Sequence, residues 1–528
     1  MNRIYRFLFP TLLTFNLLFG NTAKQVYQQL DPLSLPQLLA FLQLYPQSEE
    51  ADKVMVKLSD LLGVSQEAIQ ELPSDVFQQE LADIVYGALL RFQSPKLSPS
   101  SQLIDWVAKY CGQLSNRSLK GYGISSEKEL LELDESEWDL SRAVLLSTLG
   151  EKHIDRIRTY EANLDLMALQ VKARIGSNAT NEDKVHALNA LIFDELRFRF
   201  PPHTLSEEKI SEYSFLNSVM DAKKGVCLGV SILYLSLAQR LDLPLEAIAP
   251  PGHIYVRYRT EEKTINIETT ARGLNLPDEA YLGINTRLLK KRSLRDVVSM
   301  QHFNAGSGYW REENYTQAIE SYKTALKYSP NDPLVREFLA YCYLWNGEEE
   351  LGRKMCAELS GHHAEDTVSG QDILEDFNQG KTSAEALRIL FQDCKQQSSA
   401  LQARNKELKQ VLEKWPEFRS AWLHLAINYL QMRRNKEALA TLKKYHELDS
   451  QHPLVEYYLT ILCAERYECP EAWIHLEQAI KICHQAKHHP EVLKQVLKEL
   501  FHYSPNFELY KELQPLAEGI YEENKVAI

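Results

Sequence analysis

The sequence predicts a mostly helical α+β protein: a helical N-terminal region, an α+β middle region and a C-terminal solenoid of helical hairpins. Three observations predict this class. Apolar residues recur with a period near 3.6 in most of the 528-residue chain, two strand-like runs follow each other near residue 260, and small residues recur at a fixed spacing after residue 300. This length allows about three domains. We place them at residues 24–150, 151–297 and 298–528, behind a leader at residues 1–23.

The composition excludes several classes of protein. The formal net charge is −13, the pI is about 5.7, and no block of Lys and Arg interrupts the sequence, so the chain is a poor match for nucleic acid. A hydrophobic content of 44% with 25% charged residues is that of a globular protein. Eight cysteines are too few for a disulfide scaffold.

The N-terminal leader has the layout of a secretory signal peptide. Arg3 and Arg6 precede an apolar run from Phe7 to Phe19, and the small residues Gly20 and Ala23 follow. A spanning helix needs roughly 20 apolar residues, which disfavours a permanent anchor. We therefore expect an exported protein, periplasmic or secreted. The alternatives are a buried N-terminal helix in a cytoplasmic protein and an uncleaved leader that anchors the chain.

The segment from residue 24 to 150 reads as a helical lead-in domain. LPQLLAFLQLYP, EEADKVMVKLSDLLG and SDVFQQELADIVYGALLRF each place apolar residues three and four apart. Two prolines and four serines at 94–101 predict a loop. We find no catalytic constellation in this segment.

The middle segment carries the candidate chemistry. Two helices open it, the second with Asn181 as its expected N-cap. A further helix, apolar on most sides and therefore buried, begins near Cys227 after Gly225. The exposed N–H groups and the dipole at a helix N-terminus favour an anion, so a thiol in the first turn tends to become the nucleophilic thiolate.

Two strand-like runs, HIYVRYR and TINIETT, supply a base and an acid. Alternation predicts His253 on one face of the first strand and Glu268 on one face of the second. Paired residue numbers sum to 521 if the turn is Thr260-Glu261 and to 523 if TEEK is the loop. Both registers leave Glu268 on the face of His253. The alternative is that Glu268 pairs with Arg257 or Arg259.

Cys227, His253 and Glu268 then form the nucleophile, base and orienting acid of a thiol acyl-transfer site. The backbone N–H of Cys227 is one oxyanion donor, and Asn217 is a candidate for a second. Taken singly, Cys227 would be a small buried hydrophobe and His253 a core histidine. Their arrangement with Glu268 favours the catalytic interpretation.

The blocks FLNSVMDAKKGVCLGVSILYLSLAQRLDLPL, PPGHIYVRY and INIETT resemble the transglutaminase-like superfamily, whose fold relates to papain-type cysteine peptidases. The match covers most of the middle segment and is nearest to a bacterial branch that joins this core to tetratricopeptide repeats. The resemblance implies Cys227 as nucleophile, His253 as base and Glu268 in place of the more usual Asp. Many relatives lack the Cys and keep the fold without the chemistry.

After residue 300 the chain resembles a tetratricopeptide-repeat array, a fold that binds peptides or protein surfaces. In the first unit the expected positions hold Gly306, Tyr309, Tyr315, Ala318, Tyr322, Ala325 and Pro330. Successive small residues are 34 positions apart at Ala318, Gly352 and Ala386, and again at Ala438 and Ala472. The spacing between Ala386 and Ala438 is 52 positions. The array is therefore interrupted or degenerate between those two alanines.

Near the C-terminus several Cys and His residues invite a zinc interpretation: Cys463, Cys469, Cys483, His475, His484, His488 and His489. Their spacing fits no recognised ligand pattern, so we predict no metal and no cofactor. Export would permit disulfides. If Cys227 stays free, at least one of the seven other cysteines must stay free too, and eight oxidised cysteines would argue against an enzyme.

The leading hypothesis is an exported cysteine hydrolase or acyl transferase that attacks an amide through a thioester, with the repeats recruiting its protein or peptide substrate. Hydrolysis is favoured over cross-linking because nothing specifies an amine substrate. The alternative is an interaction scaffold with an inert transglutaminase-like core, and a weaker one is an assembly factor for a surface complex. Apart from the leader we predict no membrane partner.

Overall fold

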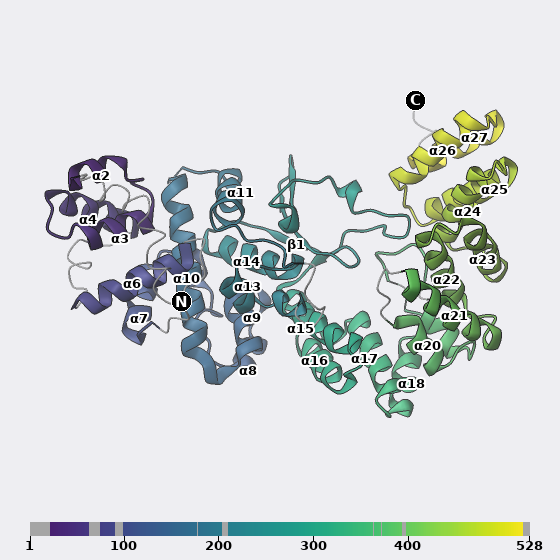
Figure 1. The fold of residues 1–528 in the computed structure, drawn as a ribbon, viewed down its shortest axis with the longest axis horizontal. Coiled ribbons are helices and arrows are strands. Elements are labelled where there is room, and N and C mark those ends of the chain that lie inside the picture. The colour runs from purple at the N-terminus through teal and green to yellow at the C-terminus, as the bar shows by residue number, and fades with distance from the viewer. Residues whose placement is uncertain are drawn as a thin grey trace. The chain divides into compact units, whose positions relative to one another are not determined.

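The computed structural model describes residues 22–62, 74–89, 99–176, 178–202, 210–362, 364–370, 372–392 and 398–520. These residues are mostly helical with a small antiparallel sheet, which confirms the mostly α, α+β class (Figure 1). The chain divides into two units, Met1–Ala247 with Tyr255–Leu274, and Ile248–Ile254 with Asn275–Ile528. The boundaries at residues 150 and 297 stay predictions. The apolar run of the leader lies outside the described residues.

The first unit begins with a series of short helices: α2 (Ala23–Gln29), α3 (Leu35–Leu44), α4 (Glu49–Leu62), α6 (Ser74–Leu89), α7 (Ser101–Tyr110), α8 (Glu127–Glu132) and α9 (Leu140–Leu149). The starts of two of them follow from capping. Ser100 accepts a hydrogen bond from the Leu103 N–H at α7, and Asp139 accepts one from the Arg142 N–H at α9. This is the helical lead-in that the apolar spacing predicts.

Buried ion pairs join these helices to the longest helix of the unit, α10 (Ile154–Ile175). The Arg142 guanidinium donates two hydrogen bonds, of 2.7 and 2.6 Å, to the Glu161 carboxylate. The Arg240 Nε donates to Asp165 at 2.8 Å. Such pairs are tolerated in a core because the opposite charges and hydrogen bonds offset the cost of desolvation. Arg240 is the last residue of helix α14 (Cys227–Arg240), so this pair holds the C-terminal end of that helix against α10.

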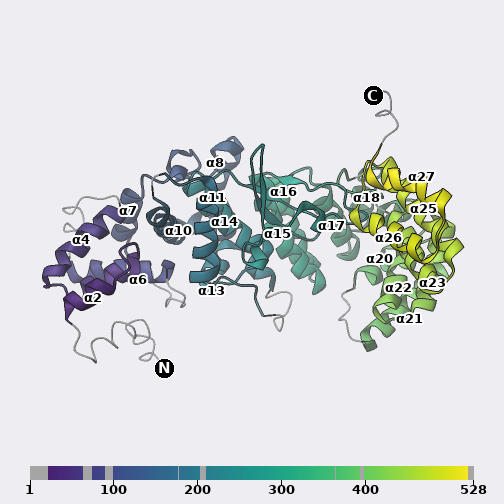
Figure 2. The ribbon, with the colours of Figure 1, turned by 90° about the horizontal axis from the view of Figure 1, so that it is seen from above.

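Helix α14 is the central helix of the first unit. All of its residues from Leu228 to Ala238 are buried, as its apolar stripes predict. It contacts α9, α10 and α13 (Leu216–Ala222), and Figure 2 shows α14 next to α10 and α13. Three-sided packing explains why the sequence of α14 is apolar on most faces.

Helix α11 (Asn181–Asn189) corrects one expectation. Thr180, not Asn181, is the N-cap, because its hydroxyl accepts from the Asp183 N–H and the Asp183 carboxylate accepts from the Thr180 N–H. This reciprocal pair is a capping box, which the Thr-x-x-Asp spacing makes possible. The π-helical turn η5 (Ala190–Glu195) continues α11.

Strands β2 (Tyr255–Arg259) and β3 (Thr264–Ile267) form the antiparallel hairpin of the first unit. Their partners are Val256 with Ile267 and Arg259 with Thr264, so residue numbers sum to 523 and TEEK is the loop. The Thr260 N–H donates to the Lys263 carbonyl at 2.8 Å and closes that loop. In the sheet, β2 lies between β3 and β1 (Glu246–Ile248).

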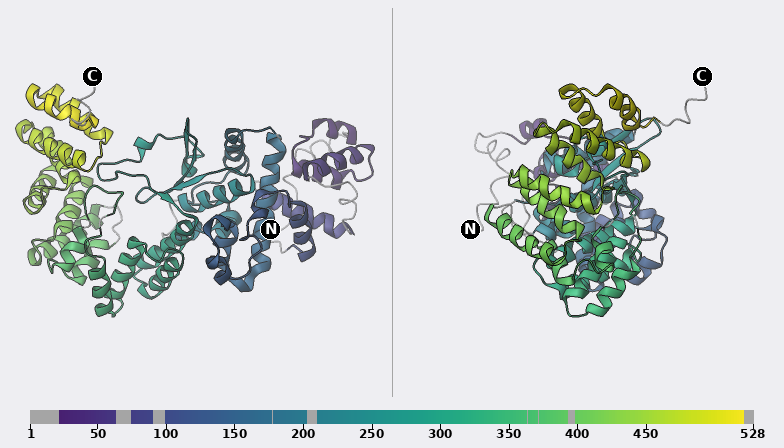
Figure 3. Two further views of the ribbon diagram at one scale, coloured as in Figure 1. Left: turned by 180° about the vertical axis from the view of Figure 1, so that it is seen from behind. Right: turned by 90° about the vertical axis from the view of Figure 1, so that its right-hand side faces the viewer.

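In the second unit, the chain leaving β1 pairs with the segment before β4 (Lys291–Arg292), where the Ala249 N–H donates to the Lys290 carbonyl at 3.0 Å. Helical hairpins follow: α15 (Leu294–Arg311), α16 (Tyr315–Tyr328), α17 (Pro333–Trp345), α18 (Glu349–Glu358), α19 (Asp372–Asn378), α20 (Ala384–Phe391), α21 (Ser398–Lys414), α22 (Arg419–Gln431), α23 (Asn435–Leu448), α24 (Pro453–Glu465), α25 (Cys469–Gln485), α26 (Glu491–Tyr503) and α27 (Phe507–Glu518). Figure 3 shows the helices from α22 to α27 stacked in chain order.

The small residues of the repeats lie where helices cross closely. Ala318, Ala386, Ala438 and Ala472 are all buried. A Cβ on Gly352 would come within 2.8 Å of the Ala340 carbonyl oxygen of the preceding helix. Helix α21 falls in the longer step between Ala386 and Ala438, which accounts for the interruption that the sequence indicates.

None of the helices in the described part of the chain combines the length and the apolar composition that crossing a bilayer requires.

Candidate functional site

Cys227 is the first residue of α14, as the sequence predicts. The loop before it is held by backbone hydrogen bonds to two other segments. The Gly225 N–H donates to the Arg199 carbonyl at 2.9 Å, and the Val226 N–H donates to the Tyr213 carbonyl at 3.2 Å. These bonds define where the loop ends and the helix begins, and so they position the thiol.

Two glycines, one on each side of Cys227, let the start of α14 pack closely against its neighbours. A Cβ on Gly225 would lie 2.7 Å from a methyl group of Val230, and one on Gly229 would lie 2.2 Å from the Tyr213 carbonyl oxygen. Both distances are shorter than nonbonded contacts allow. The Gly-Val-Cys-Leu-Gly stretch therefore lets the first turn of α14 lie directly against the backbone near Tyr213.

The exposure of Cys227 sets it apart from most of the other cysteines. Among the seven cysteines that the structure describes, only Cys227 and Cys469 are half-buried, and the other five are buried. All seven are free thiols, and Cys394 lies outside the described residues. Burial raises the pKa of the Cys356 and Cys483 thiols to about 12, which keeps them protonated and unreactive.

Lys223 lies just before this loop and was not a candidate in the sequence. It ends α13 in the left-handed conformation, at φ 49°, and its side chain is only 8% exposed. Burial lowers the pKa of the Lys223 ammonium to about 8. The sequence shows a lysine four residues before the cysteine, but only the structure shows that this lysine is buried.

Thr269 connects the Cys227 end of α14 to the segment that carries Glu268. Its hydroxyl donates to the Cys227 carbonyl at 3.4 Å and lies 3.1 Å from the Ser231 hydroxyl. Thr269 was not a candidate from the sequence, because a single Thr hydroxyl within a strand-like run carries no acid–base signal. Its place directly after Glu268 makes it the structural link between Cys227 and Glu268.

Glu268 is not in a strand, which corrects the expectation. The β2–β3 ladder ends at Ile267, and Glu268 instead caps the 3₁₀ turn η7 (Thr269–Ala271). Its carboxylate accepts from the Thr270 N–H at 3.0 Å and from the Thr270 hydroxyl at 2.6 Å. The cap ends the strand because it requires a turn conformation at the next residues. The side chain is buried, with Glu268 4% exposed.

His253 also lies outside the strands and belongs to the second unit. Its N–H donates to the Pro250 carbonyl at 3.1 Å, and Gly252 between them has φ +73°. This turn at Pro250–His253 delays the start of β2 until Tyr255, so the strand alternation does not extend to His253. The imidazole stacks on the Tyr281 ring, with centroids 6.0 Å apart.

The structure therefore places Cys227 and Glu268 on neighbouring segments of the first unit, whereas His253 is held by the second. The convergence of the three side chains stays a prediction. Asn217, the candidate oxyanion donor, lies in the first turn of α13. Its Oδ1 is buried and has no hydrogen-bond partner among the described residues, so this amide is not committed to the local fold through its oxygen.

The Cys and His residues near the C-terminus are dispersed in the second unit. His484 and His489 contact each other at 3.3 Å, and His488 contacts the Gly283 carbonyl at 2.7 Å. His475 instead meets His446 and Glu456, neither of which was a candidate. The separation of these three residues along the chain resembles no familiar ligand spacing, so only the packing of separate helices reveals the group.

Comparison with known proteins gives two family matches. Residues 158–296 match the transglutaminase-like superfamily, and residues 309–370 match the tetratricopeptide repeat. A UPF0162 protein of Pasteurella multocida is 23% identical over 197 residues, which are 35% of this chain and 73% of that protein. Tetratricopeptide repeat protein 21A of Mus musculus is 32% identical over 111 residues, 19% of this chain and only 8% of that protein.

Among solved structures, a thermophilic TPR protein of Thermus thermophilus is 16% identical and has a TM-score of 0.20, covering 39% of this chain and 99% of that one. PilF of Pseudomonas aeruginosa is 16% identical with a TM-score of 0.17, covering 42% and 98%. The two family matches coincide with the segments that hold Cys227 and the helical hairpins. The chain contains a transglutaminase-like domain over residues 158–296 and tetratricopeptide repeats over residues 309–370.

Proposed function

We propose that the protein is a cysteine-dependent amide hydrolase or acyl transferase whose repeats recruit a protein or peptide substrate. The observation that carries this proposal is the placement of Cys227. Cys227 is half-buried at the N-terminus of the central helix of a transglutaminase-like domain. Thr269, which directly follows Glu268, donates a hydrogen bond to the backbone carbonyl of Cys227. A helix N-terminus stabilises a thiolate, which is the nucleophilic form of the side chain.

In the proposed reaction, His253 takes the proton of the Cys227 thiol and the thiolate attacks the carbonyl carbon of an amide. The N–H groups of the first turn of α14 stabilise the negative oxygen, because the first N–H groups of a helix have no partner within it. The amide Nδ2 of Asn217 is the second donor. The imidazolium protonates the leaving amine, and water then hydrolyses the thioester, with His253 again as base.

Glu268 is the acid that orients His253 in this proposal. A carboxylate has two oxygens and about four acceptor positions. Thr270 bonds to one of the oxygens, Oε1, and a carboxylate bonded there can accept a further hydrogen bond from an imidazole. The buried location of the side chain would strengthen such a bond, since screening by water is weak there.

The repeats provide the surface for recruitment. A cavity of about 400 Å³ lies between α22 and α24, the first helices of successive hairpins, and is lined by residues that include Leu430, Tyr457, Tyr458 and Ile461. Both tyrosines present an apolar ring together with a polar hydroxyl, a combination that suits an extended peptide. Stacked repeats expose such surfaces along their whole length.

The second candidate function is a protein-interaction scaffold without chemistry. The capping role of Glu268 favours it, because a carboxylate held by the Thr270 N–H and hydroxyl has a structural reason to be present. In that case the domain keeps its fold, and Cys227 reacts as an ordinary thiol.

Export remains part of the proposal through the leader at positions 1–23, with Arg3, Arg6 and the apolar run that follows. Its test is fractionation of cells that express the full chain, combined with N-terminal sequencing of the mature protein. A new N-terminus near Ala23 supports export. An intact Met1 in the cytoplasmic fraction contradicts it.

Thiol alkylation with mapping of the modified peptides tests the reaction. Cys469 is a matched internal control, since it is also half-buried and is also the first residue of a helix, α25. We expect iodoacetamide to modify Cys227 at least about tenfold faster than Cys469 at pH 7, because both thiols begin a helix and only Cys227 has the proposed base His253.

The variant His253→Ala should remove most of this difference, whereas His502→Ala, at an exposed histidine of α26, should leave it unchanged. Equal rates for Cys227 and Cys469 in the wild type would contradict the enzyme and support the scaffold.

A further inference from the structure

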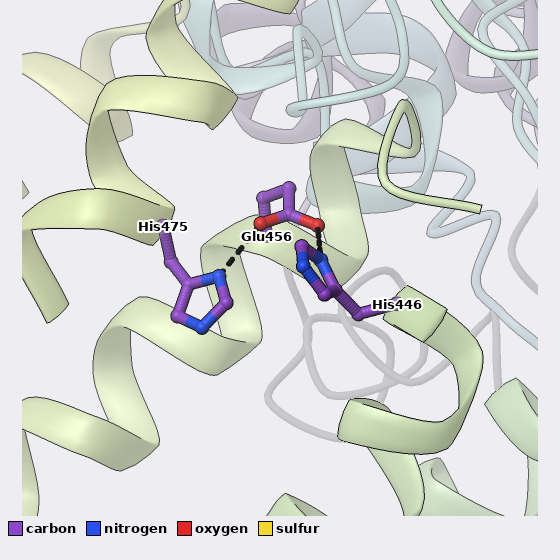
Figure 4. A group of neighbouring side chains, drawn as sticks. All are labelled: His446, Glu456 and His475. Carbon is purple, nitrogen blue, oxygen red and sulfur yellow. Dashed lines mark hydrogen bonds and ion pairs between the residues drawn. The ribbon is translucent and has the colours of Figure 1, made fainter. Parts of the chain in front are cut away.

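A group of three side chains in the second unit, His446, Glu456 and His475, has the composition of a metal site. We propose that they bind one divalent first-row transition ion, with Zn²⁺ as the reference case. Figure 4 shows the Glu456 carboxylate between the two imidazole rings. The residues come from three successive helices, α23, α24 and α25.

The donor atoms already converge. The Nδ1 of His446 lies 2.6 Å from one carboxylate oxygen of Glu456, and the Nδ1 of His475 lies 2.8 Å from the other. The three ligand atoms all lie within 4.8 Å of one another. Zn–N and Zn–O distances near 2.1 Å at the tetrahedral angle separate neighbouring ligand atoms by about 3.4 Å. The two His–Glu contacts must therefore lengthen by roughly 0.6–0.8 Å to admit the ion.

Charge balance favours a cation at this position. The Glu456 side chain is completely buried, and no Lys or Arg in the described part of the chain forms an ion pair with it. A buried carboxylate needs a compensating positive charge. A divalent ion held by the same three donor groups supplies that charge.

The site is open on one side. The His446 side chain is 34% exposed, whereas the His475 side chain is 10% exposed. Two histidines and one carboxylate leave at least one coordination position of the ion for water. An ion can therefore enter past His446 and keep a water ligand, while Glu456 and His475 hold it from the interior.

Metal binding also sets the protonation of the rings. An Nδ1 that ligates a metal carries no proton, so each neutral imidazole would hold its proton on Nε2. Without the ion, an Nδ1–H of each ring can instead donate to the carboxylate. The two states thus differ in the position of the ring protons.

The structural consequence is a cross-link between neighbouring hairpins. Helix α23 belongs to one hairpin and α24 with α25 to the next, and repeat arrays depend on such interfaces for their stability. An ion that binds only the folded array stabilises it by mass action. This role does not depend on the chemistry proposed for Cys227.

The test is Zn²⁺ titration of the untagged full chain after removal of metal with a chelator. We expect one strong site per chain and a melting temperature that rises with the Zn²⁺ concentration. The variant Glu456→Gln should weaken Zn²⁺ binding by about a hundredfold or more because it removes the carboxylate charge, and His446→Asn by at least about tenfold because it removes an imidazole ligand. His502→Asn, at an exposed histidine of α26, should bind like the wild type.

Two further readouts keep the outcome unambiguous. His446→Asn replaces a half-exposed residue, so it tests the site even if Glu456→Gln does not fold. Co²⁺ in this site should absorb in the visible region without the ultraviolet thiolate band that binding at Cys227 would produce. A wild type without a strong Zn²⁺ site, or one whose strong site persists in His446→Asn, would overturn the proposal.

Discussion

The hydroxyl of Thr269 donates a hydrogen bond to the backbone carbonyl of Cys227 at 3.4 Å, and it also lies 3.1 Å from the Ser231 hydroxyl. Ser231 is a buried residue of α14, so Thr269 contacts both the first residue of the helix, Cys227, and a residue one turn further along it. Because Glu268 directly precedes Thr269, the same contact sets the position of the candidate acid relative to the helix that carries the thiol.

Thr269→Val should destabilise the first unit by about 1–2 kcal/mol, because it keeps the shape of the side chain but leaves the Ser231 hydroxyl buried without its partner. Denaturant unfolding measures the loss. Thr269→Ser, which keeps the hydroxyl, is the control and should lose less. A Thr269→Val protein as stable as the wild type would show that this contact has no net effect on stability.

Gly229→Ala should destabilise the first unit by about 2 kcal/mol or more, because the new methyl group would lie 2.2 Å from the Tyr213 carbonyl oxygen, and the overlap forces the helix or the Tyr213 segment to move. Thermal unfolding tests this expectation. Gly283→Ala is the matched control, since a Cβ there meets nothing within 4 Å. Equal effects of the two substitutions would contradict the close approach at α14.

Lys223→Met should stabilise the protein by about 1–3 kcal/mol at pH 7, because it removes a charged group from a buried position. The pKa of Lys223 is about 8 in the folded protein and near 10.4 in the unfolded chain. Between those values the unfolded chain binds more protons, so the wild type gains stability as pH rises.

The difference between the wild type and Lys223→Met should therefore narrow from pH 8 to pH 10. Chemical denaturation across this range measures it. A variant that is less stable than the wild type at pH 7 would show that the ammonium group has a stabilising role that outweighs its desolvation.

His424 should make the second unit sensitive to acid. Burial and the neighbouring Arg404 guanidinium lower the pKa of His424 to about 4, from an ordinary value near 6.5. Between pH 6.5 and 4 the unfolded chain binds a proton that the folded protein excludes, so stability falls as pH falls. Above pH 6.5 this histidine contributes no pH dependence.

Comparison of the wild type with His424→Gln isolates this effect. The wild type should lose about 3 kcal/mol more than the variant between pH 7 and pH 4. His502→Gln, at an exposed position, is the control and should follow the wild type. Parallel pH profiles for the wild type and His424→Gln would contradict the lowered pKa.

Several features of the candidate site were predictable because they depend on residues close together in the chain. Gly225 followed by an apolar helical pattern predicts that α14 begins near Cys227. The polar TEEK segment predicts the loop of the hairpin and, with it, one of the two registers considered. Local patterns of this kind depend on backbone preferences and side-chain periodicity, which neighbouring residues determine.

The deviations arose where a local hydrogen bond ended a regular pattern. A turn closed by Pro250 and His253 delays the strand, and the capping of Thr270 by Glu268 ends the next one. Strand alternation therefore did not reach either residue. Prolines before His253 and a Glu-Thr-Thr stretch signal such interruptions, but they do not show at which residue pairing stops.

The amino-acid sequence determined the mostly helical fold class, the spacing of the repeats and the position of Cys227 at the start of a helix. These features follow from periodicities and turns within a few residues. Tertiary structure alone decided that Thr269 bonds to Cys227 and that the side chains of His446, Glu456 and His475 form one cluster. Such contacts join residues on separate helices and turns. They depend on how helices pack, which no local pattern specifies.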